Sequence, residues 1–575
     1  MPVWGGACAT IGVPKDGCAE GFVHDGTGGC TPVLPAMSCP PGKTAIPGDT
    51  TCRDVAPCGE GTFGSIVAEP NTLFVDGSVA SSGDGTRASP FKTVDEALAK
   101  VRRGTRPIIA LAAGVYPDII LEVDARVIGR CPAMVEVRGT DATYAAVEVF
   151  SDAEVRGIAV TGPGPGILAA SGSKLAIADV WVHATTRFGI GVQGLGASDE
   201  HPATIDNALV EDVKEFGIWI FGGEATVSRS VVRDIREGMG VRAEIYAKTS
   251  TPAHLTLKRS LVERAHEVGV SSLASKVDVF GTAVLDTLPR VSDKRLGAGF
   301  SAVEYPKTKA RGELNVTQSF VSGSRRAGLY FDNSSGKIDR TVVRDGHGVD
   351  DGRYGDGAQF LYGSTVEVVD SLFVGNRNTG IAFAGSTGTI ERTLVRDTQP
   401  SQSDKLGFGI AAWNLEAEGS DVRIRSCRVS KAHDSAISIG ASHVVIEDSA
   451  LLDTLPRSDG LFGDGLTVTS VFGRTLTKSV FPASVTLARS LIARSRRAGV
   501  LLDGATLELR DSALECNALD LQVTDDLGTR DTGEKVTSPW TLGSSGLVSC
   551  GCGTTLTTCT AQQSSIAPAA APTYD

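Results

Sequence analysis

Short apolar runs with a two-residue alternation recur along most of this chain. A typical run begins with glycine and continues as apolar, variable, apolar, as at residues 217–220 (Gly-Ile-Trp-Ile), 380–383 (Gly-Ile-Ala-Phe) and 499–502 (Gly-Val-Leu-Leu). Such alternation places one set of side chains on one face of a β-strand. The runs are too short for α-helices, so the pattern predicts many short strands.

These runs belong to a longer repeat. A Ser, Thr or Asn anchor such as Ser230, Ser371 or Ser490 precedes each run, followed by apolar residues and a polar turn. The shortest anchor spacings are about 22 residues, the length of three short strands with their turns in one coil of a solenoid. We therefore predict an all-β, right-handed parallel β-helix over residues 108–525. Around fifteen coils stacked about 4.8 Å apart would make a rod of about 70 Å.

An amphipathic helix is predicted just before the first coil. Thr93 and Glu96 have the spacing of a capping box. Apolar residues then recur at helical spacing over 94–103, and Gly104 is expected to end the helix. A helix here would cover the open edge of the first coil. Residues 64–107 are therefore expected to form an N-terminal cap.

Cysteines mark both ends of the chain. Residues 1–63 are predicted to form a loop-dominated disulfide module, because an even, dense cluster in a Gly- and Pro-rich stretch is typical of an oxidising compartment. Its six cysteines are Cys8, Cys18, Cys30, Cys39, Cys52 and Cys58. Six cysteines allow 15 pairings, and the sequence does not choose among them. Zinc is disfavoured, since this stretch has neither a Cys-x-x-Cys pair nor a nearby pair of histidines.

The other end, residues 526–575, is expected to cap the rod or to trail from it. It carries Cys550, Cys552 and Cys559, and Cys516 could reach one of these three. We expect all four to form disulfides.

Charge and hydropathy exclude several partners. The formal net charge is −12, which argues against nucleic acid or an anionic membrane surface. No apolar run approaches the roughly 18 residues that span a bilayer. The first residues do not resemble a secretory leader, whereas Cys8 after Gly5-Gly6-Ala7 suggests a lipoprotein site if a leader precedes it. The expected location is the cell exterior or the cell envelope.

Four similar insertions, at 288–297, 346–357, 399–407 and 455–465, recur at roughly every second coil and should emerge on one side of the rod. A second class, at 242–256, 301–314 and 467–486, should emerge elsewhere. The first class supplies four binding candidates: Asp293, Asp404, Asp459 and Asp464. It also supplies the weak catalytic candidates His347, Asp350, Asp351 and Asp356.

Three interpretations of these acidic loops remain open. Paired carboxylates can act as general acid and base on a glycosidic bond. Carboxylate oxygens can also hold calcium, the one cofactor that the sequence suggests. Alternatively, Asp and Gly are turn formers and the loops are solvated. The doublets Arg325-Arg326 and Arg496-Arg497 occupy equivalent turns and are predicted to be solvated corners rather than a groove for a polyanion.

The stretch 84–101 and the coils that follow resemble right-handed parallel β-helix proteins of the pectin-lyase-like superfamily, over residues 72–525. The cysteine-rich head joined to a rod also resembles uncharacterised cell-envelope proteins of myxobacteria. The superfamily contains lyases, hydrolases, epimerases, tailspikes and adhesins, so the resemblance implies a fold rather than an activity.

Polygalacturonase-like hydrolases of that superfamily carry a paired-Asp motif, then Gly-His-Gly, then Arg-Ile-Lys, on different coils. Here Gly-His-Gly at 346–348 is followed by Asp350-Asp351 in the same loop, and Arg-Ile-Arg at 423–425 lies far downstream. The order is wrong, so we interpret the match as chance.

The sequence thus favours a non-catalytic surface protein for binding, adhesion or structural display, with a polysaccharide or a cell-surface partner. The alternative is a polysaccharide-active lyase or hydrolase that uses the acidic loops.

Overall fold

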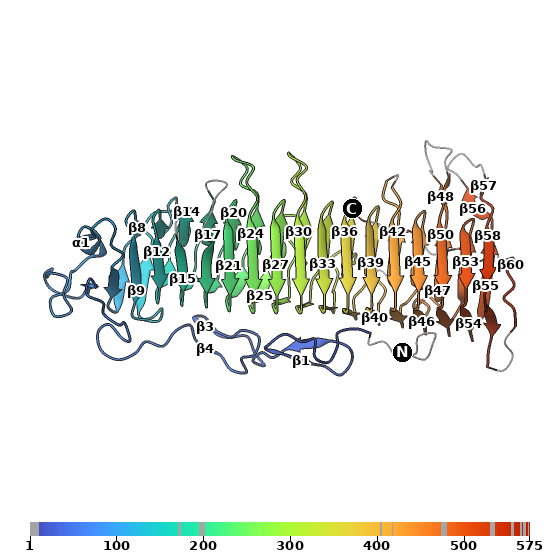
Figure 1. Cartoon of the computed structure of the whole chain (residues 1–575), viewed down its shortest axis with the longest axis horizontal. Helices are drawn as coiled ribbons and strands as arrows, with labels where there is room; N and C mark the ends of the chain where they lie inside the picture. Colours follow the sequence, from blue (N-terminus) through green and yellow to red (C-terminus); the bar gives the residue numbers. More distant parts are fainter. Residues whose placement is uncertain are drawn as a thin grey trace.

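The fold is a right-handed parallel β-helix, seen in a computed structural model (Figure 1). The structure describes residues 11–574 apart from 171–173, 195–201, 403–404, 417, 473–479, 530–534, 554–556, 564–565, 567, 569–570 and 573. Three long parallel sheets of 18, 17 and 17 strands run the length of the described chain. Seventeen strands spaced about 4.8 Å apart make a rod of about 80 Å.

We call the three sheets A, B and C, in the order in which the chain visits them in each coil. Sheet A runs from β5 (Leu73–Val75) to β58 (Thr541–Ser545), and sheet B from β7 (Gly114–Tyr116) to β59 (Ser549–Gly551). Sheet C consists of β8 (Ile119–Leu121), β11 (Val147–Val149), β14 (Ile167–Ala170), β17 (Phe188–Gln193), β20 (Phe216–Phe221), β23 (Met239–Glu244), β26 (Val268–Leu273), β29 (Ala298–Val303), β32 (Ala327–Asp332), β35 (Asp356–Leu361), β38 (Thr379–Ala384), β41 (Phe408–Trp413), β44 (Ser435–Gly440), β47 (Asp464–Thr469), β52 (Ala498–Asp503), β55 (Leu519–Thr524) and β60 (Gln562–Gln563).

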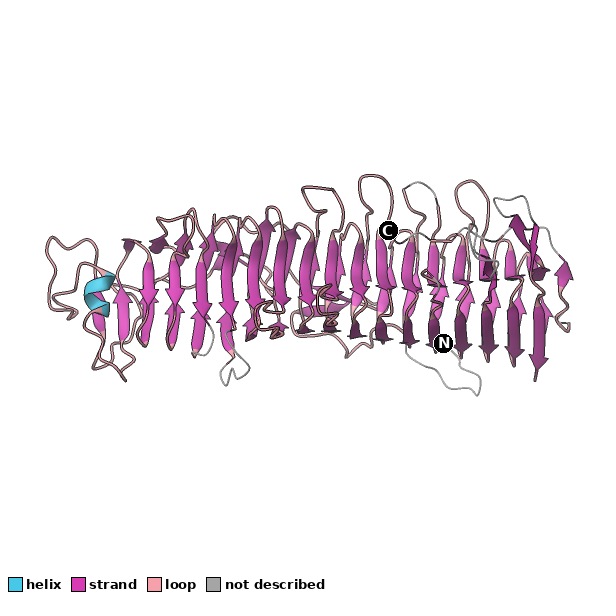
Figure 2. Cartoon of the chain, turned by 90° about the horizontal axis from the view of Figure 1, so that it is seen from above, coloured by secondary structure: helices cyan, strands magenta, loops and turns pink. Residues whose placement is uncertain are grey.

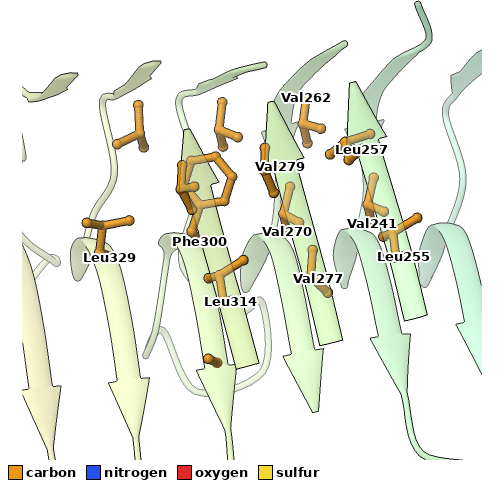
Figure 3. Close-up of a cluster of buried hydrophobic side chains, with 14 of the residues drawn as sticks. Val241, Leu255, Leu257, Val262, Val270, Val277, Val279, Phe300, Leu314 and Leu329 are labelled. Carbon is orange, nitrogen blue, oxygen red and sulfur yellow. The ribbon is translucent and has the colours of Figure 1, made fainter. Parts of the chain in front are cut away.

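The core is the continuous stack of inward side chains that the alternation predicted. Each strand pairs in register with its equivalent in the next coil, so like positions stack on one another. In sheet C, for example, Phe360 of β35 pairs with Phe383 of β38. Figure 3 shows such a stack, with Phe300, Leu314 and Leu329 pointing to the inside of the coil. The stack fills the interior with hydrocarbon, which stabilises the rod by removing apolar surface from water.

The Ser and Thr anchors form a ladder of hydrogen bonds at the turn between sheets A and B. Backbone N–H groups of buried anchors donate to the hydroxyl of the anchor one coil further on, as from Ser230 to Ser260 (3.2 Å) and from Ser371 to Thr393 (3.4 Å). Cys427 takes one place in the ladder, and its N–H donates to the Ser449 hydroxyl at 3.1 Å. The repeated anchor residues therefore satisfy backbone donors that the turn leaves buried.

Replacing Ser449 by alanine is expected to lower the free energy of unfolding by about 1–3 kcal/mol, because the buried N–H of Cys427 loses its acceptor. Urea unfolding measures the change, with the exposed Ser81→Ala as control. Equal stability of the two variants would show that the ladder does not contribute.

The cap helix is present but shorter than predicted. Helix α1 covers Val94–Leu98, with the capping box of Thr93 and Glu96 in place. The prediction that it continues to residue 103 and ends at Gly104 is wrong. Beyond Leu98 the backbone hydrogen bonds join residues three apart, as in a turn. One example is the Val101 N–H, which donates to the Leu98 carbonyl at 3.0 Å. Val94 and Ala97 pack on the first coils and cover the end of the core.

The coils also continue past residue 525, the predicted end of the rod. Strands β58, β59 and β60 extend all three sheets to Gln563. The sequence pattern missed this coil because β58 (Thr-Leu-Gly-Ser-Ser) is mostly exposed and lacks an apolar alternation. Two disulfides hold the coil instead, Cys516–Cys552 and Cys550–Cys559.

The cysteine-rich N-terminal region is a strap along the rod rather than a separate head (Figure 1). Residues 11–63, the N-terminal strap, contain two short hairpins: β1 (Phe22–His24) with β2 (Cys30–Pro32), and β3 (Lys43–Thr44) with β4 (Arg53–Asp54). The strap packs its few apolar side chains on outward residues of sheet B, among them Leu209, Phe320 and Leu372.

The disulfides of the strap are Cys18–Cys30, Cys39–Cys52 and Cys58–Cys131. The expectation that the six N-terminal cysteines pair among themselves is wrong for Cys58, which is bonded to Cys131 in the rod. Cys8 lies outside the described residues. Within the part of the chain that the structure describes, no helix is long and apolar enough to cross a membrane.

Candidate functional site

Two rows of loops border the outer face of sheet C. One row, between sheets B and C, contains the four acidic insertions, at 286–297, 345–355, 397–407 and 453–463. They emerge on one side at every second coil, as predicted, and Figure 2 shows them along one edge of the rod. The second class emerges at the turn between sheets C and A, as at 245–253 and 304–312. The outer face of sheet C therefore lies between two walls.

The outer face of sheet C is buried from solvent along these strands, unlike the outer face of sheet A. Strand β42 (Asp421–Arg425) of sheet A alternates exposed and buried residues. In contrast, every residue of β35, β38, β41, β44, β47 and β52 is buried. The outward side chains of these six strands of sheet C form the floor of a groove that loops and the C-terminal segment cover.

One end of this floor carries a cluster around Arg326, made of Arg326, Tyr330, Tyr354, Asp356 and Gln359. The Arg326 guanidinium lies 4.6 and 4.8 Å from the ring centroids of Tyr330 and Tyr354, a cation–π arrangement. Its Nε donates to Gln359 Oε1 at 3.1 Å, and Gln359 Nε2 donates to Asp356 Oδ2 at 2.8 Å. Asn378 Nδ2 donates to the other oxygen of Asp356, at 2.9 Å.

Four coils further on lies a similar cluster around Asp434, made of Asp434, Arg457, Phe462, Asp464 and Arg497. Arg497 Nε donates to Asp464 Oδ1 at 2.8 Å. Arg457 and Arg497 lie 4.1 and 4.8 Å from the centroid of Phe462. Asp434 is fully buried, 3.8 Å from Arg457 Nη1, and neither of its oxygens accepts a hydrogen bond within the described structure. From the coil spacing, the two clusters are about 19 Å apart.

Between the clusters the floor is made of small and aromatic side chains. Ala382, Ala384, Phe408, Ala411 and Trp413 form one apolar patch. A pocket of about 580 Å³ lies among the loops that border this face. It is lined by residues of both clusters and of the intervening loops, Tyr354, Asn378, Lys405, Arg457 and Phe462, and by Pro568 and Ala571 near the C-terminus. A smaller pocket of about 310 Å³ lies between the first two acidic loops.

The same face continues toward the N-terminal end of the rod as an aromatic cluster. Trp219 of β20 lies 5.1 Å from Phe216 and 4.3 Å from Phe221, measured between ring centroids. Tyr246, on the loop that follows β23, lies 6.1 Å from Phe221. Partly exposed ring faces such as these can stack on flat apolar ligand surfaces.

The structure divides the predicted acidic residues into two groups. Asp293, Asp350, Asp351 and Asp459 are exposed in the loops, as is His347. Asp293, Asp351 and Asp459 accept backbone N–H groups two residues on, at 2.8–3.0 Å, as turn-forming aspartates do. Asp404 lies outside the described residues. The second group, Asp356 and Asp464, is buried in the floor of the groove.

No three His, Cys, Asp or Glu side chains among the described residues come together in a way that could hold a metal ion. Calcium at the acidic loops stays a prediction.

Sequence reasoning did not single out Asp434, and it did not place Arg326 and Arg497 in the two clusters. The prediction of solvated corners is wrong for Arg326, which is 6% exposed. The sequence feature that could have revealed the two clusters is the repeated Arg-Arg-Ala-Gly at 325–328 and 496–499. An Asp-Gly at 356–357 and at 464–465 likewise replaces the small or apolar residue that opens other strands of this sheet.

Burial changes the protonation of three carboxyl groups on this face. Burial raises the pKa of Asp356, Asp434 and Asp503 from 3.8 to about 7 in each case. Arg457 opposes the shift at Asp434, while the Asp464 charge adds to it. The folded protein therefore binds more protons than the unfolded chain between pH 4 and pH 7.

A group whose pKa is raised on folding stabilises the fold less as the pH rises from its unfolded to its folded value. We expect the free energy of unfolding to fall between pH 4 and pH 7 and then to level off. Asp434→Asn should flatten this dependence by about 1–4 kcal/mol, and the matched control is Asp421→Asn at an exposed position of sheet A. Urea unfolding at pH 5 and pH 8 measures both, and an Asp434→Asn profile as steep as that of the wild type would contradict the assignment.

Comparisons with known proteins give similarity to solved structures only. A mutant of the periplasmic alginate epimerase AlgG aligns over 67% of this chain and 78% of its own, with 11% identity and a TM-score of 0.37. A variant catalytic domain of GH87 alpha-1,3-glucanase, in complex with tetrasaccharides, aligns over 86% and 70%, with 10% identity and a TM-score of 0.30. No family model and no curated protein matches the chain. Similarity this low carries no argument about function, and the resemblance to myxobacterial envelope proteins stays a prediction.

Proposed function

We propose that this chain binds a polysaccharide along the outer face of sheet C, at the cell exterior or in the cell envelope. The observation that carries the proposal is the walled groove with an arginine–aromatic–aspartate cluster at each end. The five disulfides of the described residues favour an oxidising compartment.

The chemistry of the 580 Å³ pocket suits sugar rings. Sugars present hydroxyl groups that both donate and accept hydrogen bonds, and Asn378, Lys405 and Arg457 line the pocket with polar groups. Sugar rings also have apolar faces, and Tyr354 and Phe462 supply flat aromatic surfaces beside these groups. The length of the groove suits an extended polymer, because equivalent positions recur at about 4.8 Å along it.

Phe462→Ala is expected to weaken polysaccharide binding about tenfold, since aromatic side chains in buried pockets often contribute most of the binding energy. The matched control is Leu461→Ala, because Leu461 is 55% exposed and does not line the pocket. Affinity electrophoresis against a panel of neutral and acidic polysaccharides measures the change. If no polysaccharide binds, or if the two variants lose affinity equally, the proposal is wrong.

A second candidate function is hydrolysis of the bound polysaccharide, favoured by the state of Asp434. A carboxyl group kept protonated near neutral pH can act as a general acid. Asp464 opens the next strand of sheet C, and pairs in register with Ser435, the residue after Asp434. Two carboxyl groups in different environments are what a glycosidic bond requires for acid and base roles.

Hydrolysis predicts new reducing ends when the protein is incubated with a polysaccharide that it binds. Asp434→Asn should abolish this release while leaving binding intact, and Asp421→Asn at an exposed position of sheet A should change neither. Release that survives in Asp434→Asn would exclude Asp434 as the acid, and absence of release from the wild type would leave binding alone as the function.

A further inference from the structure

The C-terminal segment returns from the end of the rod to its middle. Strand β60 lies at the far end of sheet C, whereas Tyr574 packs with residues of β38 and β41, in the middle of the rod. The described residues of this segment are Ile566, Pro568, Ala571, Pro572 and Tyr574, and they follow the last disulfide, at Cys559.

Tyr574 occupies the floor of the groove. It is 6% exposed and belongs to the same apolar patch as Ala382, Ala384, Ala411 and Trp413. Pro568 and Ala571 form part of the wall of the 580 Å³ pocket. We propose that this segment is a built-in occupant of the groove, which a polysaccharide must displace in order to bind. The identity of the competing ligand rests on the proposed function. The contact between Tyr574 and the floor of the groove does not depend on it.

The shape of the floor explains why an aromatic side chain fits here. Outward positions elsewhere on sheet C carry large side chains, such as Tyr330 of β32 and Leu501 of β52. The equivalent positions of β38 and β41 are Ala382 and Ala411. Two alanines side by side leave space for one ring above them, and Tyr574 fills it.

Tyr574 is held in the groove by apolar contact. The Tyr574 hydroxyl is buried without a hydrogen-bond partner within the described structure. Burial and the nearby charge of Asp356 raise the pKa of Tyr574 well above its usual value, so it stays a neutral phenol. Proline and alanine side chains form no hydrogen bonds. A ligand whose hydroxyl groups find partners in this space would avoid the cost of burying the unpaired Tyr574 hydroxyl.

The test uses the full chain carrying Tyr574→Ala, with Tyr144→Ala as control because Tyr144 is 64% exposed. The probe is a fluorescent peptide with the sequence of residues 564–575, followed by fluorescence anisotropy. The Tyr574→Ala chain should bind this peptide at least about tenfold more tightly than the wild type and the control do. A peptide with alanine in place of its Tyr574 should not bind.

A second arm measures polysaccharide binding by the same proteins. If Tyr574→Ala raises affinity for a bound polysaccharide about tenfold, the segment competes with that ligand as inferred. If the peptide binds but no polysaccharide does, the groove binds the C-terminal segment and the inference stands, whereas the proposed function is wrong. If Tyr574→Ala binds neither peptide nor polysaccharide more tightly than the control, the inference is overturned.

Discussion

Replacing Arg233 by methionine is expected to lower the free energy of unfolding by about 3–5 kcal/mol, because it breaks a buried ion pair on one side only. Arg233 is 2% and Glu211 5% exposed, and Arg233 Nε donates to Glu211 Oε2 at 2.8 Å. Arg233 Nη2 also donates to the carbonyls of Pro40 and Lys43, at 3.0 and 3.1 Å. The substitution leaves the Glu211 carboxylate buried without its cation.

The same change should release the N-terminal strap from sheet B. Glu211 also accepts the Gly42 N–H and Trp181 Nε1, both at 2.8 Å, so the pair joins strap and rod. Limited proteolysis should then cleave near residue 40 in Arg233→Met at a protease concentration that leaves the wild type intact.

The matched control is Arg229→Met on the neighbouring turn. Arg229 pairs with Asp206, but its side chain is 53% exposed, so its loss should cost less than about 1 kcal/mol. Urea unfolding of the three proteins gives the comparison. Equal losses for the two variants would mean that the strap is not held by the buried pair.

Replacing Phe360 by alanine is also expected to cost about 3–5 kcal/mol. Phe360 is completely buried, with its ring centroid 5.4 Å from that of Phe331 and 4.8 Å from that of Phe383. The three rings fill one region of the interior across consecutive coils. Removing the middle ring leaves a cavity that the paired strands on either side cannot close.

Phe280→Ala on sheet A is the control for this change, because its side chain is 40% exposed. It should lower the free energy of unfolding far less than Phe360→Ala, as measured by urea unfolding. A comparable loss at both positions would contradict a close-packed interior at Phe360.

The rod was predictable because its signal is local and repeated. Alternation of apolar residues determines which side chains face inward, and the Ser and Thr anchors mark the turns whose backbone donors they satisfy. The last coil escaped prediction, since its strand β58 has no alternation and disulfides stabilise it. The strap escaped because its apolar contacts are with sheet B, far away in sequence.

The groove was only half predictable. The acidic loops were found, together with the side of the rod from which they emerge. Sequence alone did not show that Asp356 and Asp464 leave the loops and open strands of the floor. It also did not show that Arg326 is buried between two tyrosines on the outer face of sheet C, because arginines on an outer face are normally solvated. Tyr574 covers part of the floor, and it lies over 200 residues after Asp356 in the sequence, so no local pattern predicts the contact.

Hydrogen exchange with and without a bound polysaccharide tests the central claim that the outer face of sheet C is the binding surface. The account predicts slower exchange in the loops 345–355 and 453–463, which border the two clusters, and unchanged exchange along the outer face of sheet A. Slower exchange confined to sheet A or to the N-terminal strap, with these two loops unaffected, would contradict it.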